Sequence, residues 1–118
     1  MGIEIHSGHF SSMGDVLDDI KAHGTWPTTF VSGPSEGLAV HWHDHDVHAY
    51  IMEGDTDFLD GETGERTPVH RGDKVVIPAR TLHAEGAVAE RVVYVLAVPE
   101  PLPGEKFLVR RDASELRQ

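Results

Sequence analysis

Residues 41–48 have the sequence His-Trp-His-Asp-His-Asp-Val-His, so four of the nine histidines of the chain lie within eight positions. His41, His43 and His45 follow a period of two, at which the side chains of a β-strand return to the same face, roughly 6–7 Å apart. Two imidazoles at that spacing can bind one metal ion, each through a nitrogen about 2 Å from it. The stretch therefore predicts a metal site on a β-strand, completed by at least one ligand from elsewhere in the chain.

The size and composition indicate one β-rich domain. The chain has 118 residues, and its twelve glycines and seven prolines are spread at short intervals, which indicates many turns and short strands. It contains no cysteine, which excludes disulfide scaffolds, thiolate metal sites and cysteine nucleophiles. A metal must therefore be held by imidazole, carboxylate or water.

The charge narrows the classes of partner. A net charge of −10 argues against nucleic acid and against anionic membrane surfaces. No apolar run approaches the roughly 18 residues that span a bilayer, and the N-terminus lacks the basic start and apolar core of a signal peptide. We expect a soluble cytoplasmic protein with no nucleic-acid or membrane partner.

The pattern of residues predicts three segments. Residues 1–25 form an N-terminal extension with one helix at about 11–23, residues 26–110 form a β-barrel, and residues 111–118 form a polar tail. The expected strands are 28–31, 38–43, 47–53, 56–59, 67–70, 74–77, 82–85, 91–98 and 106–109. Short strands with a turn signal about every ten residues are typical of an antiparallel sandwich or barrel.

The predicted helix has clear signals at both ends. Ser11 or Ser12 can cap its N-terminus, and Gly24 is placed to end it. Four apolar residues at i, i+3, i+4 and i+7 form one stripe, namely Met13, Val16, Leu17 and Ile20. We expect this stripe to pack on the barrel or on a partner subunit.

The histidine stretch resembles the first conserved motif of the cupins, which are small β-barrels. That motif runs HxH, three or four residues, Glu, six residues, Gly. Here His41 and His43 are followed after three residues by Val47, and six residues further on by Gly54. The spacing agrees with the motif, but valine stands where cupins with a complete site usually place glutamate.

A second segment resembles the other cupin motif, which runs Gly, five residues, Pro-x-Gly, two residues, His. The corresponding residues are Gly72, Pro78, Arg80 and His83, with arginine in place of the second glycine. Together the two matches cover about residues 37–87. The resemblance implies an all-β fold, the cupin-type double-stranded β-helix or jelly-roll barrel, with the short N-terminal helix added.

The resemblance also implies a metal site formed by His41, His43 and His83. A three-histidine site resembles that of iron-dependent dioxygenases that cleave small diketones. We expect one divalent transition metal, iron if the protein is an enzyme, with zinc, nickel or manganese as alternatives. Imidazole suits these metals, and three ligands leave positions open for water, substrate or oxygen.

Further ligands are open alternatives because Val47 is not a carboxylate. His45 has the strand parity of His41 and His43 and is a candidate fourth ligand, whereas His48 has the opposite parity and faces outward unless a bulge shifts the register. Three acidic residues are expected to lie at the rim or to orient a histidine, namely Asp44, Asp46 and Glu85.

The strand register predicts a small apolar substrate pocket. Its inward residues are Ala39, Val47, Ala49 and Ile51. The apolar residues of the opposite face, Leu38, Val40, Trp42, Tyr50 and Met52, need a cover, which is the N-terminal helix or the second subunit of a homodimer. Arg80 lies beside the mouth, either to hold a substrate carboxylate or as a solvated loop residue.

These observations predict a metal-binding cupin, a small-molecule metalloenzyme of dioxygenase or oxidoreductase type. Three neutral imidazoles leave the full charge on a dipositive ion, which favours a small anionic organic molecule as substrate. No residue is assigned a catalytic role. The alternatives are a cupin that binds or senses a small ligand without catalysis, a metal-free isomerase with a histidine–carboxylate base, and a cupin that has lost its metal.

Overall fold

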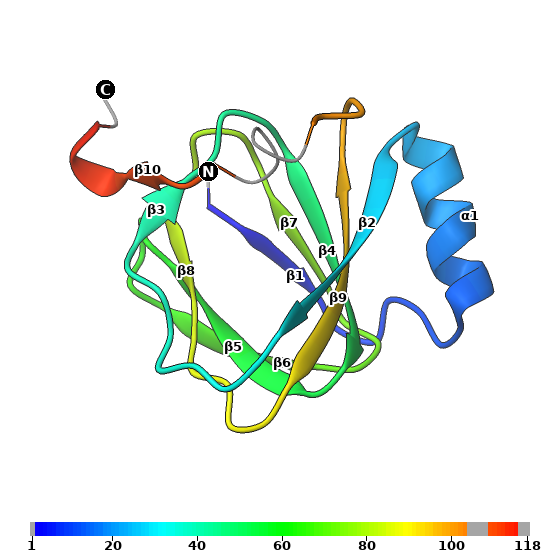
Figure 1. The fold of residues 1–118 in the computed structure, drawn as a ribbon, viewed down its shortest axis with the longest axis horizontal. Coiled ribbons are helices and arrows are strands. Elements are labelled where there is room, and N and C mark those ends of the chain that lie inside the picture. The colour runs from blue at the N-terminus through cyan, green and yellow to red at the C-terminus, as the bar shows by residue number, and fades with distance from the viewer. Residues whose placement is uncertain (1, 104–108, 116–118) are drawn as a thin grey trace.

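The computed structural model describes residues 2–103 and 109–115 and shows a helix packed on a β-barrel (Figure 1). In chain order the elements are β1 (Glu4–His6), α1 (Met13–His23), β2 (Trp26–Ser32), β3 (His41–Trp42), β4 (Val47–Glu53), β5 (Asp55–Asp60), β6 (Arg66–His70), β7 (Lys74–Ile77), β8 (His83–Glu85), β9 (Val92–Val98), β10 (Arg111–Asp112) and η2 (Ala113–Glu115). One sheet has the strand order β1-β7-β4-β9-β2, and the other has the order β10-β3-β8-β5-β6. All pairs of neighbouring strands are antiparallel.

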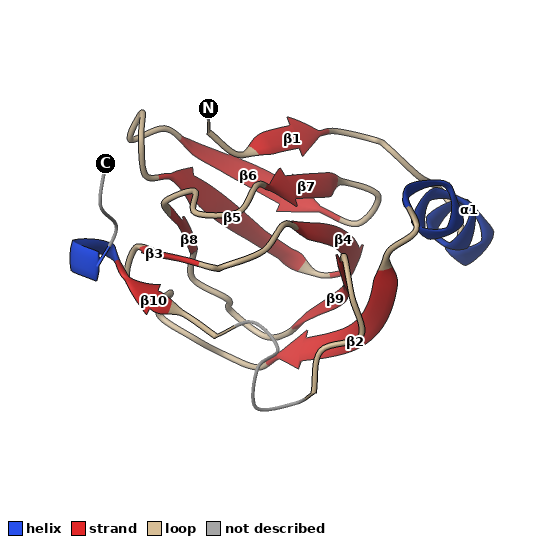
Figure 2. Cartoon of the chain, turned by 90° about the horizontal axis from the view of Figure 1, so that it is seen from above, coloured by secondary structure: helices blue, strands red, loops and turns tan. Residues whose placement is uncertain are grey.

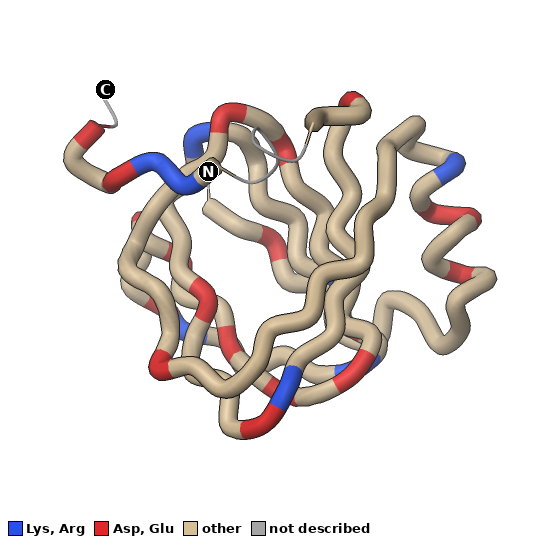
Figure 3. The backbone as a smooth tube through the Cα atoms, viewed as in Figure 1, with Lys and Arg blue, Asp and Glu red and all other residues tan. Residues whose placement is uncertain are grey.

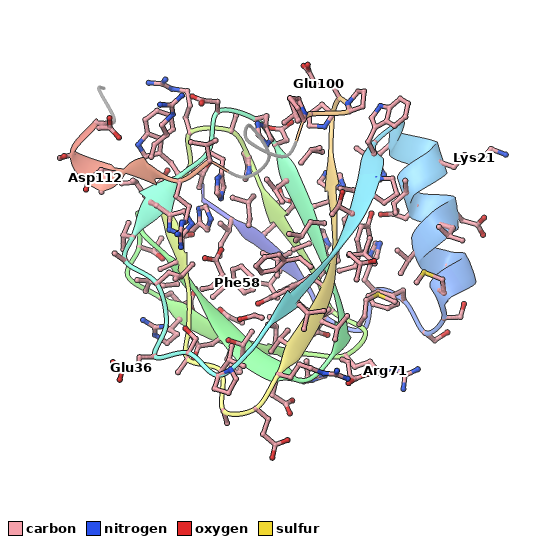
Figure 4. The ribbon with its side chains drawn as sticks, in the orientation of Figure 1. Lys21, Glu36, Phe58, Arg71, Glu100 and Asp112 are labelled. Atoms are coloured by element: carbon pink, nitrogen blue, oxygen red, sulfur yellow. The ribbon has the colours of Figure 1, made fainter. Side chains whose placement is uncertain are left out.

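The two sheets enclose one apolar core (Figure 2). Phe58 on β5 points into this interior, as Figure 4 shows, and it is 1% exposed. Along β9, every second residue from Val92 to Val98 joins the core between the sheets. The residues in between, Val95 and Ala97, pack on the other side of the same strand. β9 is therefore buried on both faces, which explains its almost continuous run of apolar residues.

Helix α1 covers the outer face of the sheet that contains β4 and β9 (Figure 1). Its N-terminus has a capping box between Ser12 and Asp15, and Gly24 ends it with a φ of 66°. Val16 and Ile20 are buried against Tyr50 and its neighbours. The helix therefore covers the predicted outer face at Tyr50, whereas Trp42 lies in the other sheet, where its Nε1 donates a 3.0 Å hydrogen bond to the carbonyl oxygen of Asp112. Met13 and Leu17, the rest of the predicted stripe, stay about half exposed.

A buried polar network joins the helix to the barrel. Lys74 on β7 is 3% exposed, and its Nζ lies 2.6 Å from Oδ2 of Asp19 on α1. The same oxygen accepts a hydrogen bond of 2.6 Å from the hydroxyl of Tyr50 on β4. His9 and His23 flank the other oxygen of Asp19, at 3.5 and 3.6 Å. One carboxylate thus fixes the helix to two strands of the sheet.

One predicted strand is shorter in the structure, and two strands are present that were not predicted. Of the strand expected at 38–43, only His41–Trp42 is regular, because residues 38–40 follow the turn at Gly37 without strand pairing. β1 and β10 were not expected, since each is a short edge strand fixed by its partner, β7 and β3 respectively. Most of the strand expected at 106–109 lies outside the described residues.

The described surface agrees with the acidic composition. Acidic residues are spread along the helix, the turns and the ends of the barrel (Figure 3). In the part of the chain that the structure describes, α1 is too short to cross a bilayer, and no other helix is long and apolar enough to do so.

Candidate metal centre

The structure brings His41, His43 and His83 together inside the barrel. His41 on β3 pairs directly with His83 at the start of β8, and His43 follows β3 by one residue. The centroid of the His41 ring lies 4.5 Å from that of His83 and 5.1 Å from that of His43. One ring nitrogen of each histidine lies within 4.8 Å of the others, and all three residues are buried. The pairing of β3 with β8 thus brings together candidate ligands that are about forty residues apart in the sequence.

Backbone hydrogen bonds fix the orientation of each ring. In all three histidines Nδ1 lies at hydrogen-bond distance from a carbonyl oxygen: 2.7 Å to Ala39 for His41, 2.9 Å to Val109 for His43 and 2.9 Å to Thr81 for His83. A carbonyl oxygen can only accept, so each Nδ1 carries the hydrogen. The lone pair of each neutral ring therefore lies on Nε2, the nitrogen left to bind a metal.

Burial keeps these rings in the form that binds metal. Burial lowers the pKa of His41 and lowers the pKa of His43 to about 4, so both imidazoles are neutral at pH 7. Nε2 of His83 is buried and has no hydrogen-bond partner among the described residues. A buried polar atom without a partner is costly, and a metal ion would satisfy it. The three side chains therefore fit a divalent transition metal.

Glu85 lies against the same nitrogens, so of its two expected places, at the rim or beside a histidine, the structure shows the second. Its Oε1 is 3.4 Å from Nε2 of His41, and its Oε2 is 3.5 Å from Nε2 of His83. Burial by itself raises the pKa of Glu85, but its interactions with His83 and His41 outweigh burial and lower it overall. The carboxylate is not at the rim. The spacing His83-x-Glu85 on β8 was the available signal, because residues two apart on a strand share a face.

The histidines open on a mostly apolar cavity. The cavity has a volume of about 370 Å³, and His41, His43 and Glu85 contribute to its wall. Its apolar lining includes Phe30, Leu38, Phe58, Ile77, Val88 and Leu96. An apolar cavity with a few polar groups gathered at one place is typical of a small-molecule site.

The pocket residues predicted from strand parity agree with the structure only in part. Val47 and Ala49 on β4 line the cavity, whereas Ile51 lies further along the strand, in the core between the sheets. Ala39 is exposed and Leu38 lines the cavity in its place. The reason is that residues 38–40 do not form a strand, so alternation cannot be extended through them.

Of the two alternatives for Arg80, the structure agrees with the exposed loop residue. It has a φ of 63°, and its backbone nitrogen donates a 2.9 Å hydrogen bond to the carbonyl oxygen of His43. Its guanidinium lies over the Trp42 ring, 5.2 Å from the centroid, and the residue does not line the cavity. Among the described lining residues the single positively charged side chain is Arg110.

The two candidate additional ligands, His45 and His48, lie outside the cluster of three. The ring of His45 stacks on that of His43, with 6.4 Å between centroids. The ring of His48 lies on the helix side, 5.0 Å from that of His23, and these two form a separate group with Asp19. The outward direction expected for His48 thus leads to the interface beneath α1.

The remaining two acidic residues have structural contacts. Asp44 accepts hydrogen bonds of 2.8 and 2.9 Å from the guanidinium of Arg111 on β10. Asp46 accepts a 2.8 Å hydrogen bond from the backbone nitrogen of Ala79. Both therefore hold loops around the site together.

No family model matches the sequence, and no curated protein matches it either. Three similar solved structures share its fold. A DUF861 family protein from Thermotoga maritima has a TM-score of 0.57 and 18% identity, and the match covers 81% of this chain and 98% of that chain. A cupin superfamily protein from Desulfitobacterium hafniense has a TM-score of 0.53 and 16% identity, covering 63% and 65%. A TDP-quinovose 3,4-ketoisomerase from Campylobacter jejuni has a TM-score of 0.61 and 14% identity, covering 77% and 72%.

These similarities establish the fold. The chain has the cupin fold, a double-stranded β-helix, as its two motifs predict. A fold of this kind supports many different reactions, so the function has to be argued from the site.

Proposed function

We propose that this cupin-fold protein is a metal-dependent enzyme that acts on a small organic anion, with oxidoreductase chemistry of the dioxygenase type. The observation that carries the proposal is the convergence of three buried imidazoles whose Nδ1 atoms are all committed to carbonyl oxygens. Such a set presents three Nε2 lone pairs to one point at the end of a cavity, which is the donor set of a transition-metal site with open positions.

The residues of the cavity suit the binding of such a substrate. His41, His43 and His83 would hold the metal, which when bound supplies Lewis-acid and redox chemistry. The apolar wall, including Val47 and Phe58, excludes water from the bound substrate.

Arg110 is the residue that we propose for binding a substrate carboxylate. Arg110 lines the cavity, and a guanidinium binds a carboxylate through paired hydrogen bonds. The substrate is therefore proposed to be apolar apart from one acidic group. The expected homodimer stays a prediction.

Metal binding is the first test. The purified protein is incubated with Fe²⁺, Zn²⁺, Ni²⁺ or Mn²⁺, desalted and analysed for metal, and about one ion per chain is expected. His83→Ala is expected to lose the ion. His70→Ala is the matched control, because His70 has a side chain that is 66% exposed and lies outside the site. Metal content near zero in the wild type would refute the proposal.

Turnover is the second test. Iron-loaded protein is expected to consume oxygen with at least one member of a panel of small carboxylic acids and diketones, and His83→Ala is expected not to. Tight binding of a panel member without oxygen consumption would instead identify a protein that binds or senses its ligand.

A metal-free isomerase is the second candidate, favoured by the contact between Glu85 and His83. A histidine beside a carboxylate can act as a general base, and His83 has a free Nε2 facing the carboxylate. One structure with a similar fold is a ketoisomerase. Isomerisation of a keto sugar that persists after complete removal of metal by a chelator would establish this alternative.

A further inference from the structure

Three imidazole Nε2 atoms and one carboxylate lie close together at one end of the cavity. Each of the three histidines carries its hydrogen on Nδ1, so its Nε2 is an acceptor. The fourth group is Glu85, whose two oxygens face Nε2 of His41 and Nε2 of His83. Nε2 of His83 and Oε1 of Glu85 are both buried without a hydrogen-bond partner among the described residues, and a cation bound between the histidines and the carboxylate would satisfy both atoms.

We propose that Glu85 is a fourth, anionic ligand of the metal, so that the site is a three-histidine, one-carboxylate centre. This inference rests on the metal site proposed above and adds a ligand that lies two residues beyond His83. It assigns the carboxylate to β8, on the strand next to β3, whereas Val47 is on β4 in the other sheet.

The distances agree with shared coordination. Two ligand atoms bound to one ion at about 2.1 Å in tetrahedral geometry are about 3.4 Å apart. The two contacts of Glu85 measure 3.4 and 3.5 Å, longer than a good hydrogen bond between a charged nitrogen and a carboxylate oxygen, which is about 2.8 Å. Oε1 thus lies at this separation from His41, and Oε2 lies at it from His83.

A purely structural role for Glu85 lacks the partners it would need. The side chain is 22% exposed, and Oε1 is buried without a hydrogen-bond partner among the described residues. Structural carboxylates in this chain are paired, as Asp19 is with Lys74 at 2.6 Å. A metal ion bound beside Oε1 would supply the missing partner.

The fourth ligand also defines the charge of the substrate. Three imidazoles and one carboxylate around a dipositive ion give a centre with a net charge of +1. A monoanionic enolate or carboxylate neutralises that charge. We therefore infer that the site accepts a monoanion in preference to a dianion of similar size.

The test compares Glu85→Gln with the wild type in titrations with Co²⁺, followed by calorimetry and by the visible absorption of the bound ion. Glutamine keeps the shape of the side chain and removes its charge. The Kd is expected to rise at least tenfold, and the absorption bands of Co²⁺ are expected to shift because a ligand has changed. Glu36→Gln is the matched control, since Glu36 is exposed on a loop at the edge of the molecule (Figure 4).

Urea unfolding with and without Co²⁺ separates a metal ligand from a structural residue, because loss of a structural contact would lower the midpoint equally in both conditions. Co²⁺ is expected to raise the urea midpoint of the wild type more than that of Glu85→Gln, because the wild type binds the ion more tightly. A Kd within twofold of the wild type, or the same rise of the midpoint with Co²⁺ in both proteins, would overturn the role of Glu85. Failure of every protein, including the wild type, to bind Co²⁺ would instead overturn the proposed metal site itself.

Discussion

Replacing Asp19 by asparagine is expected to destabilise the protein by about 3 kcal/mol, whereas the same change at Asp18 is expected to cost less than about 0.5 kcal/mol. The Asp19 carboxylate accepts bonds of 2.6 Å from Lys74 and from Tyr50, and the Lys74 ammonium is only 4% exposed. Removing the negative charge leaves that ammonium buried and unpaired. Breaking a buried pair in this way costs about 3–5 kcal/mol. The lower end applies because the Asp19 side chain is 19% exposed and asparagine can still accept from Tyr50.

Asp18 is the matched control because it is the preceding residue on the same helix and is exposed. Urea unfolding followed by circular dichroism at pH 7 gives both free energies of unfolding. The double variant Asp19→Asn, Lys74→Met is expected to be more stable than Asp19→Asn alone, since it removes the unpaired charge. If Asp19→Asn and Asp18→Asn differed by less than about 0.5 kcal/mol, the network would not fix the helix to the barrel.

The pH dependence of stability tests the same carboxylate. Burial raises the pKa of Asp19, but its bonds to Lys74 and Tyr50 lower it more strongly, so the folded pKa lies below the unfolded value of about 3.9. A lowered folded pKa means that the stabilisation is complete above about pH 4 and is lost as the pH falls further. The wild type is expected to show this loss between about pH 4 and pH 2, and Asp19→Asn is expected to lack it.

The remaining predictions concern other parts of the fold. Burial and the charge of Lys74 lower the pKa of His48 to about 4. The free energy of unfolding of the wild type is therefore expected to fall by about 1 kcal/mol between pH 7 and pH 5, after allowance for partial exposure, and that of His48→Gln is expected to fall less. Urea unfolding at the two pH values would contradict this if the fall were the same in both proteins. Gly54 has a φ of 94°, and an added Cβ would overlap the carbonyl oxygen of Arg91, so Gly54→Ala is expected to cost more than about 3 kcal/mol. Gly64→Ala, with a φ of 78° and open space around the added carbon, is expected to cost only about 1 kcal/mol, and equal melting temperatures for the two variants would exclude the overlap as the cause.

Local sequence signals predicted the regular elements well where the signals were strong. The bounds of β4 and β7 agree with the prediction residue for residue, because a turn glycine follows β4 and a proline follows β7. The helix begins after Ser12 and ends at Gly24, since both caps are hydrogen-bond arrangements within a few residues. β1 and β10 could not be predicted, because strands of three and two residues are fixed by their partners in the sheet.

The sequence by itself determined the cupin fold and selected His41, His43 and His83, because motif spacing records which residues share a strand face. It could not determine which side chains meet across strands. Only the tertiary structure placed Glu85 against two of the histidines and Arg110 at the cavity, and it moved Arg80 onto Trp42. The physical reason is that strand parity fixes the face of a side chain, whereas its neighbours depend on sheet order and on the path of irregular segments. Glu85, the carboxylate that we propose as the fourth ligand, stands two residues after His83 in the sequence, but only the packing of β8 beside β3 brings it against the histidines.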